Sequence, residues 1–72
     1  MNDDEQTILE FLRQSPEAAF ARREIARRAV KRTVYEQNQH WADRPLSTLV
    51  ARDLVEIDNG GLYRLRKDDV LR

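Results

Sequence analysis

The segment from Val55 to Leu65 constrains the fold more than any other part of the sequence. Apolar residues alternate with polar ones on both sides of an Asn-Gly-Gly run, with Val55 and Ile57 before it and Tyr63 and Leu65 after it. Alternation on both sides of a Gly-rich turn is typical of a β-hairpin. The sequence therefore predicts two short antiparallel strands here.

The length of the loop decides the register of this hairpin. A two-residue Asn-Gly loop would pair Ile57 with Leu62 and would divide the apolar side chains between the two faces of the sheet. A three-residue loop pairs Ile57 with Tyr63 and keeps all four apolar side chains on one face. It also places Gly61 at the left-handed position that such loops require. We therefore predict the three-residue loop, positive φ at Gly61 and four apolar side chains that face the core.

Two helices are predicted before the middle of the chain. The first begins with Asp3 as N-cap and Gln6 as its return partner, and it stops at the Ser15-Pro16 pair. The second is predicted from about Arg22 to Lys31, where apolar residues recur at i, i+1, i+4 and i+5. Residues 18–21, just before it, suit a short extended stretch.

A third helix is predicted from Trp41 or Pro45 to Arg52, because apolar residues again share one side and proline is tolerated in a first helical turn. Residues 32–40 suit a strand or a turn as well as a helix, so their conformation stays open. The pattern indicates a mainly α domain of three helices with a small C-terminal β-hairpin.

A chain of 72 residues has room for one hydrophobic core and one domain. We expect an ordered part from about residue 4 to residue 66 and a frayed tail at 67–72. The side chains predicted to fill the core are Ile8, Leu12, Ile25, Leu46, Leu49 and Leu54.

Composition excludes several classes of function. The chain has no cysteine and one histidine, so disulfides and cysteine or histidine zinc sites lack ligands, although carboxylate metal sites stay possible. His40 has no partner at a spacing typical of a catalytic triad, and we expect no enzyme, no metal and no cofactor. The chain begins with an acidic stretch at residues 1–5 and has no long apolar run, and both features favour a cytoplasmic protein without membrane contact.

Two stretches resemble winged helix-turn-helix domains. The stretch ARREIARRAV (21–30) is similar to their second helix, and LSTLVARDLVEIDNGGLYRL (46–65) is similar to a third helix running into a wing. Together they cover about 30 of the 72 residues. The resemblance implies a winged helix fold of three helices plus a C-terminal wing, in which the third helix enters the DNA major groove while the second helix and the wing contact phosphates.

The resemblance also implies which residues would contact double-stranded DNA. The residues that would read bases lie on the outward side of the third helix, at Arg44, Ser47 and Thr48, with Ala51 beside them. The residues that would contact phosphates are the basic side chains Arg23, Arg27, Lys31, Arg64 and Arg66. On one helix face such cations can neutralise successive phosphates and release counterions.

The net charge of the chain and the position of Trp41 leave binding of a partner protein open as a second function. Thirteen basic and thirteen acidic residues balance, although residues 13–44 carry eight bases against four acids. Trp41 either packs against Val34 or Tyr35 or stands exposed as an anchor for a partner protein. The basic residues favour a DNA-binding regulator or accessory protein. The zero net charge and an exposed Trp41 would favour a protein interaction module.

Overall fold

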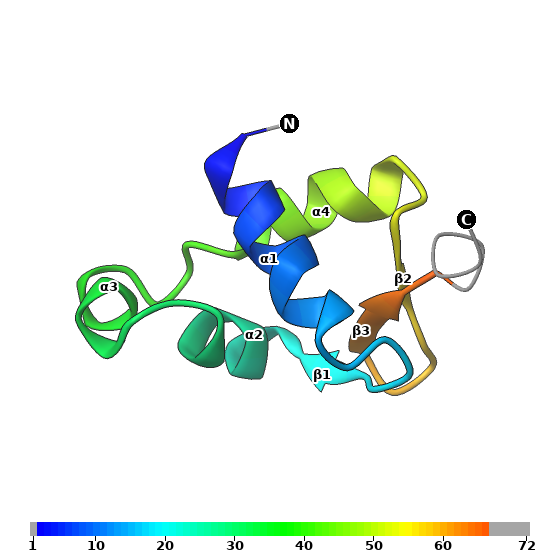
Figure 1. Ribbon diagram of the computed structural model, residues 1–72, viewed down its shortest axis with the longest axis horizontal. Helices are drawn as coiled ribbons and strands as arrows, with labels where there is room; N and C mark the ends of the chain where they lie inside the picture. The colour runs from blue at the N-terminus through cyan, green and yellow to red at the C-terminus, as the bar shows by residue number, and fades with distance from the viewer. Residues whose placement is uncertain (1, 67–72) are drawn as a thin grey trace.

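A computed structural model of the chain describes residues 2–66. These residues form a small mixed α/β unit with four helices and a three-stranded antiparallel sheet (Figure 1). The tail predicted at 67–72 lies outside the described residues. In chain order the elements are α1 (Asp3–Arg13), β1 (Phe20–Ala21), α2 (Arg22–Arg28), α3 (Arg32–Gln37), α4 (Asp43–Ala51), β2 (Val55–Ile57) and β3 (Leu62–Leu65).

The sheet has the order β1-β3-β2, so the strand β3 is central. Phe20 pairs with Tyr63 across the first strand pair, and the segment suited to an extended stretch is thus a third strand. The prediction of a hairpin alone was therefore incomplete. Extended backbone at residues 20–21 uses the free edge of β3, which a two-stranded hairpin would leave open.

The predicted register of the hairpin is confirmed. Val55 lies opposite Leu65, Ile57 lies opposite Tyr63, and Gly61 has φ of 80°. Asp58 closes the loop, since its Oδ1 accepts hydrogen bonds from the backbone N–H of Gly60 at 2.8 Å and of Leu62 at 3.0 Å. An aspartate at this position holds a turn because its side chain imitates a backbone acceptor.

One part of the hairpin prediction was wrong. Val55 and Leu65 are buried and Tyr63 is partly buried against the core, but Ile57 is 48% exposed. Ile57 stands at the end of β2 next to the loop, and Figure 1 shows that this loop lies at the end of the hairpin away from α4. Alternation predicts which face of the sheet a side chain lies on. It does not predict how far along the strand the core extends.

The core lies between α1, α2, α4 and the sheet. Five of the six predicted core side chains are fully buried, whereas Leu54 is only partly buried at the turn after α4. Leu54 follows the end of the helix, where the chain turns towards the sheet and one side of the residue stays open. The buried apolar residues are Ile8, Leu9, Leu12, Ile25, Ala26, Ala42, Leu46, Leu49, Val55 and Leu65.

The first helix begins one residue earlier than predicted. Asn2, and not Asp3, is the N-cap, because its Oδ1 accepts a hydrogen bond from the backbone N–H of Glu5 at 2.8 Å. Asp3 then lies inside the first turn, where its negative charge interacts favourably with the positive end of the helix dipole. Both residues are good N-caps, so the sequence alone does not choose between them. The helix ends at Arg13, before the Ser15-Pro16 pair as predicted.

The second helix is shorter than predicted. It ends at Arg28, and Lys31 is the extended N-cap of α3, with φ of −64° and ψ of 151°. Ala29 and Val30 are partly buried in the turn between the two helices. Ala29 and Val30 therefore extend the apolar stripe of α2 although the helix has already ended. For this reason the spacing of apolar residues predicted a longer helix. The segment whose conformation was open forms α3, so there are four helices where three were predicted.

The third predicted helix is α4, which begins at Asp43, between the two proposed starts. It ends in a Schellman motif: the N–H of Leu54 donates to the carbonyl of Leu49 at 3.0 Å and the N–H of Asp53 to that of Val50 at 3.0 Å. Asp53 has φ of 62°, the only positive φ at a non-glycine residue in the described part of the chain. Pro45 is accommodated in the first turn, as predicted.

Asp53→Gly is expected to raise the free energy of unfolding by about 0.5 to 1 kcal/mol. Glycine adopts positive φ without the steric cost that an L side chain has there, which stabilises the folded state. This stabilisation is expected to exceed the opposing effect of glycine, which makes the unfolded chain more flexible. The lost ion pair with Arg66, at 3.2 Å, involves an aspartate side chain that is 77% exposed and contributes little. Urea denaturation checks the change, with Asp53→Ala as the matched variant that loses the same carboxylate and keeps the strain. Equal stability of the two variants would contradict it.

No helix within residues 2–66 is long and apolar enough to span a membrane.

Candidate nucleic-acid interface

The two sides of α4 differ in chemistry. Leu46 and Leu49 are fully buried, and Pro45 is buried beside them. The outward side carries the residues predicted to read bases: Arg44, Ser47 and Ala51 are exposed and Thr48 is partly buried. The spacing of these four residues puts them on one face of the helix. The Thr48 hydroxyl donates to the Arg44 carbonyl at 3.2 Å.

The basic residues around α2 divide into paired and unpaired groups. Three side chains are engaged: Arg22 with Asp43 at 3.3 Å, Arg28 with Glu24 at 3.5 Å and Arg32 with Glu36 at 2.8 Å. Arg23, Arg27 and Lys31 are exposed and form no ion pair with any residue in 2–66. Unpaired cations give up no internal contact when they meet a phosphate. Arg23 and Arg27 share the helix, whereas Lys31 lies in the turn after it.

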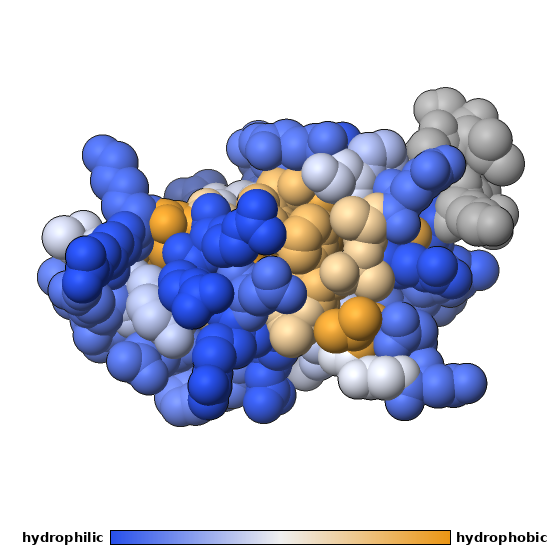
Figure 2. All heavy atoms as spheres, turned by 90° about the horizontal axis from the view of Figure 1, so that it is seen from below, coloured by the Kyte–Doolittle hydropathy of each residue, from blue (hydrophilic) through white to orange (hydrophobic). Residues whose placement is uncertain are grey.

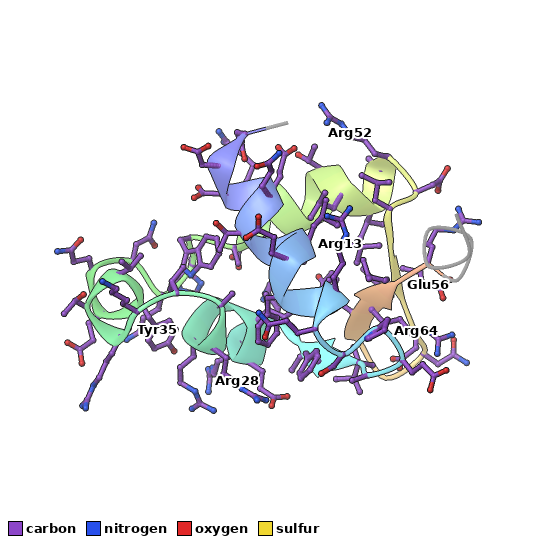
Figure 3. The ribbon with its side chains drawn as sticks, in the orientation of Figure 1. Arg13, Arg28, Tyr35, Arg52, Glu56 and Arg64 are labelled. Carbon is purple, nitrogen blue, oxygen red and sulfur yellow. The ribbon has the colours of Figure 1, made fainter. Side chains whose placement is uncertain are left out.

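Arg28 has an additional role in packing. Its guanidinium lies 5.5 Å from the centre of the Phe20 ring and 5.8 Å from that of Phe11. The two rings lie 4.9 Å apart, tilted by 53°. Figure 3 shows the Arg28 side chain below α2, on the same side of the molecule as β1. A cation over two aromatic faces is stabilised by both rings, so Arg28 joins α2 to α1 and β1.

The wing arginines predicted to contact phosphates are held by acids. Arg64 Nε donates to Glu56 Oε1 at 3.0 Å, and the two side chains lie together on the hairpin in Figure 3. Arg66 Nη1 lies 3.2 Å from Asp53 Oδ1. Each pair would have to share or release its arginine before a phosphate could be bound, so these two positions are poorer phosphate ligands than the α2 cations.

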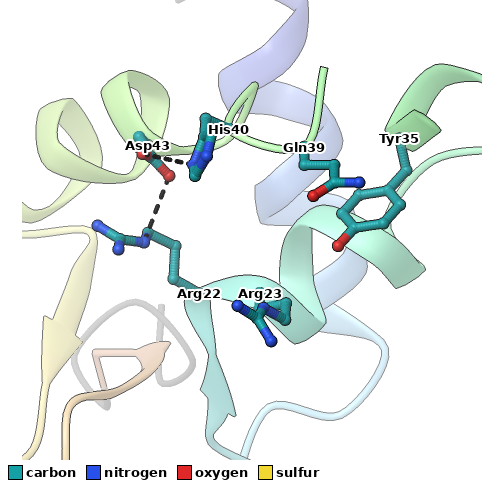
Figure 4. A pocket seen from close by; sticks show the side chains of 6 residues that line it. All are labelled: Arg22, Arg23, Tyr35, Gln39, His40 and Asp43. Atoms are coloured by element: carbon teal, nitrogen blue, oxygen red, sulfur yellow. Dashed lines mark ion pairs between the residues drawn. The ribbon is translucent and has the colours of Figure 1, made fainter. Parts of the chain in front are cut away.

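The zero net charge conceals an uneven distribution of free charges. Asp3, Asp4 and Glu10 are exposed on α1 and take part in no ion pair with the described part of the chain. The unpaired cations of α2 and Arg44 of α4 lie elsewhere. Figure 4, a close view of the surface between α2, α3 and α4, shows α1 behind these helices. Three acids without an ion pair therefore stand against one such base, Arg13, on α1, whereas the unpaired charges of α2 and α4 named above are all positive.

A polar cleft of about 380 Å³ lies between α2, α3 and the start of α4 (Figure 4). Its lining residues are Arg22, Arg23, Tyr35, Gln39, His40 and Asp43. Asp43 is the centre of a polar cluster, because Arg22 Nε lies 3.3 Å from its Oδ1 and His40 Nδ1 lies 3.4 Å from its Oδ2. The cleft adjoins α4 directly, since Asp43 is the first residue of that helix.

Trp41 is partly buried and packs against the core. Its indole Nε1–H donates to the carbonyl of Ala26 at 2.8 Å. This bond ties the connection between α3 and α4 to α2, and it satisfies the polar end of the ring as buried tryptophans require. The indole thus helps to hold one wall of the cleft in place.

The sequence did not reveal the cleft. Tyr35 and Gln39 stand in the segment whose conformation the sequence left open, and Arg22 stands out only as the start of the predicted second helix. The one available signal was the Arg22 and Asp43 pair of opposite charges, but 20 intervening residues gave no reason to join them. Within residues 2–66, no group of three or more histidine or acidic residues could hold a metal ion.

No protein-family model matches the chain, and no curated protein and no solved structure matches it. The function is therefore inferred from the geometry of this chain alone.

Proposed function

We propose that this chain is a winged helix domain that binds double-stranded DNA without enzymatic activity, as a small regulator or accessory protein. In this proposal α4 enters the major groove and the hairpin of β2 and β3 is the wing. The order of the elements supports the fold, because α1, β1, α2, α4, β2 and β3 follow one another as the winged helix pattern requires. The short helix α3 is an addition between α2 and α4.

One observation carries the DNA proposal: cations without internal partners lie on the two elements that a winged helix turns towards DNA. Arg23 and Arg27 of α2 and Arg44 of α4 are exposed and form no ion pair within residues 2–66. Arg23 lines the same cleft as the first residue of α4, so the two elements are neighbours on this surface. Lys31, in the turn after α2, adds a fourth cation.

Substitutions are expected to separate base contacts from phosphate contacts. Arg27→Gln should weaken binding to all duplex sequences alike and should flatten the plot of log K against log salt by about one unit, because one phosphate contact is lost. Arg44→Ala or Ser47→Ala should instead change the preference among sequences. Fluorescence anisotropy with labelled duplexes at several salt concentrations measures both effects.

Arg13→Gln is the matched control for these variants. Arg13 is exposed, forms no ion pair within residues 2–66 and lies on α1, so its loss changes the net charge equally without removing a proposed contact. The expected result is an unchanged salt slope. A slope reduced as much as in Arg27→Gln would mean that net charge alone governs binding.

A protein partner is the second candidate, because apolar surface is exposed. Figure 2 shows apolar atoms gathered in the middle of the lower face, with polar atoms around them. Phe20 and Ala21 of β1 are partly buried and Ile57 is 48% exposed. Apolar surface of this kind occurs at protein interfaces. Trp41 is a weaker anchor for such a partner than the sheet residues, because its indole N–H is already bonded to Ala26.

A further inference from the structure

The cleft between α2, α3 and the start of α4 has the chemistry of a site for an anion. It is lined by polar side chains, and positive groups exceed negative ones, because two guanidinium groups face one carboxylate. Arg22 Nε lies near one oxygen of Asp43, and the imidazole of His40 lies near the other. The positive charge of Arg22 thus offsets the repulsion that Asp43 would exert on an incoming anion.

Three donors in the cleft are left without an internal partner. The Arg23 guanidinium, the Tyr35 hydroxyl and the Gln39 side-chain amide form no hydrogen bond or ion pair with the part of the chain that the structure describes. Figure 4 shows Arg23 on α2, with Tyr35 and Gln39 on the other side of the cleft. Arg23 and Gln39 are exposed and Tyr35 is partly buried, so water meets these donors in the free chain. An anion in the cleft could replace that water without breaking any internal contact of the three side chains.

We propose that this cleft binds a phosphate group, held by Arg23, Tyr35 and Gln39. A phosphate has several acceptor oxygens and a negative charge, so it can accept from a guanidinium, a hydroxyl and an amide at once. The site goes beyond duplex binding through α4, since a small phosphate ester presents the same group. Its two sources are therefore a backbone phosphate of DNA and a free phosphate ester.

Titration of the whole chain with inorganic phosphate tests the site. Two-dimensional NMR monitors the titration, and chloride keeps the ionic strength constant. We expect saturable shifts of the Arg23 Nε–H and the Gln39 side-chain amide, with a dissociation constant on the order of 1 mM. The Nε–H of Arg13, on α1, is expected not to move. Shifts that are absent, or that grow without saturation for Arg13 and Arg23 alike, would overturn the proposal.

Variants distinguish this site from a general attraction of anions. Arg23→Gln should abolish saturable binding, whereas Arg13→Gln, with the same change of charge, should leave it as it is. Tyr35→Phe should weaken binding by roughly two- to tenfold, because one hydrogen bond is lost while the ring stays in place. Asp43→Asn should tighten binding by roughly threefold or more, since it removes the one carboxylate among the described residues that line the cleft. Equal affinity of the Arg23→Gln and Arg13→Gln proteins would refute the site, provided that their NMR spectra show the native fold.

A parallel titration with duplex DNA identifies the source of the phosphate. If the cleft takes a backbone phosphate, Arg23→Gln weakens duplex binding more than Arg27→Gln does, and free phosphate competes with the duplex. If the cleft takes a free phosphate ester, the two variants weaken duplex binding equally and pyrophosphate or a sugar phosphate binds more tightly than inorganic phosphate. Because the phosphate titration needs no DNA, its failure and the failure of the DNA proposal are separate results.

Discussion

Leu49→Ala is expected to lower the free energy of unfolding by about 2 to 5 kcal/mol, as truncations of buried leucines do. Leu49 is fully buried in the cluster where α4 meets α1 and the sheet, and its carbonyl also accepts the hydrogen bond that ends α4. A small domain has a total stability of about 5 to 15 kcal/mol, so this one change would remove a large part of it.

Urea denaturation of the Leu49→Ala protein measures this loss. Leu54→Ala is the matched control, because the same atoms are removed five residues later from a partly buried side chain. Its loss should be clearly smaller. A change below about 0.5 kcal/mol for Leu49→Ala would place that side chain at the surface and would contradict the position of α4.

Arg52→Ala is expected to cost about 1 to 3 kcal/mol, much more than the loss of an exposed ion pair. Glu5 of α1 is only 6% exposed, and its Oε1 has no hydrogen bond within residues 2–66. Arg52 Nη1, 3.6 Å from that oxygen, is the cation that faces it. Removal of Arg52 would leave a buried carboxylate without a counter-charge, which is costly in a protein interior.

A double-mutant cycle separates this effect from lost packing. In the Glu5→Gln background there is no buried charge to compensate, so Arg52→Ala should cost much less there. Arg32→Ala is the comparison for an exposed pair with Glu36, whose side chains are 89% and 56% exposed, and it should change stability by no more than about 0.5 kcal/mol. Equal costs of Arg52→Ala in both backgrounds would show that the pair contributes nothing.

Local rules predicted the hairpin well and its environment less well. The register of β2 and β3 and the positive φ of Gly61 follow from alternation and turn chemistry, which act within a few residues. The exposure of Ile57 depends on where the helices end in space, and no local pattern contains that distance. The α2 helix ends before the predicted residue for a similar reason. Ala29 and Val30 are partly buried because of how the chain packs, and not because they lie on a helix.

The residue types of the candidate interface could be predicted, and so could the ion pair that the hairpin register brings together, but the cleft could not. Exposure of Arg44 and Ser47 follows from the apolar side of α4. The pairing of Arg64 with Glu56 also follows from the register, since the two residues are direct neighbours across the strands. The cleft could not be predicted, because it depends on α3 and on a contact between Arg22 and Asp43 that joins distant parts of the chain.

A titration of labelled duplex DNA with the wild-type chain, repeated over a range of salt concentrations, tests the proposed function most directly. With about three phosphate contacts, by Arg23, Arg27 and Lys31, log K should fall with log salt with a slope near −2.7, at roughly 0.9 per phosphate. No binding at low salt up to about 100 μM, beyond the ~10⁻⁴ M typical of weak non-specific binders, would contradict DNA binding and favour a protein partner.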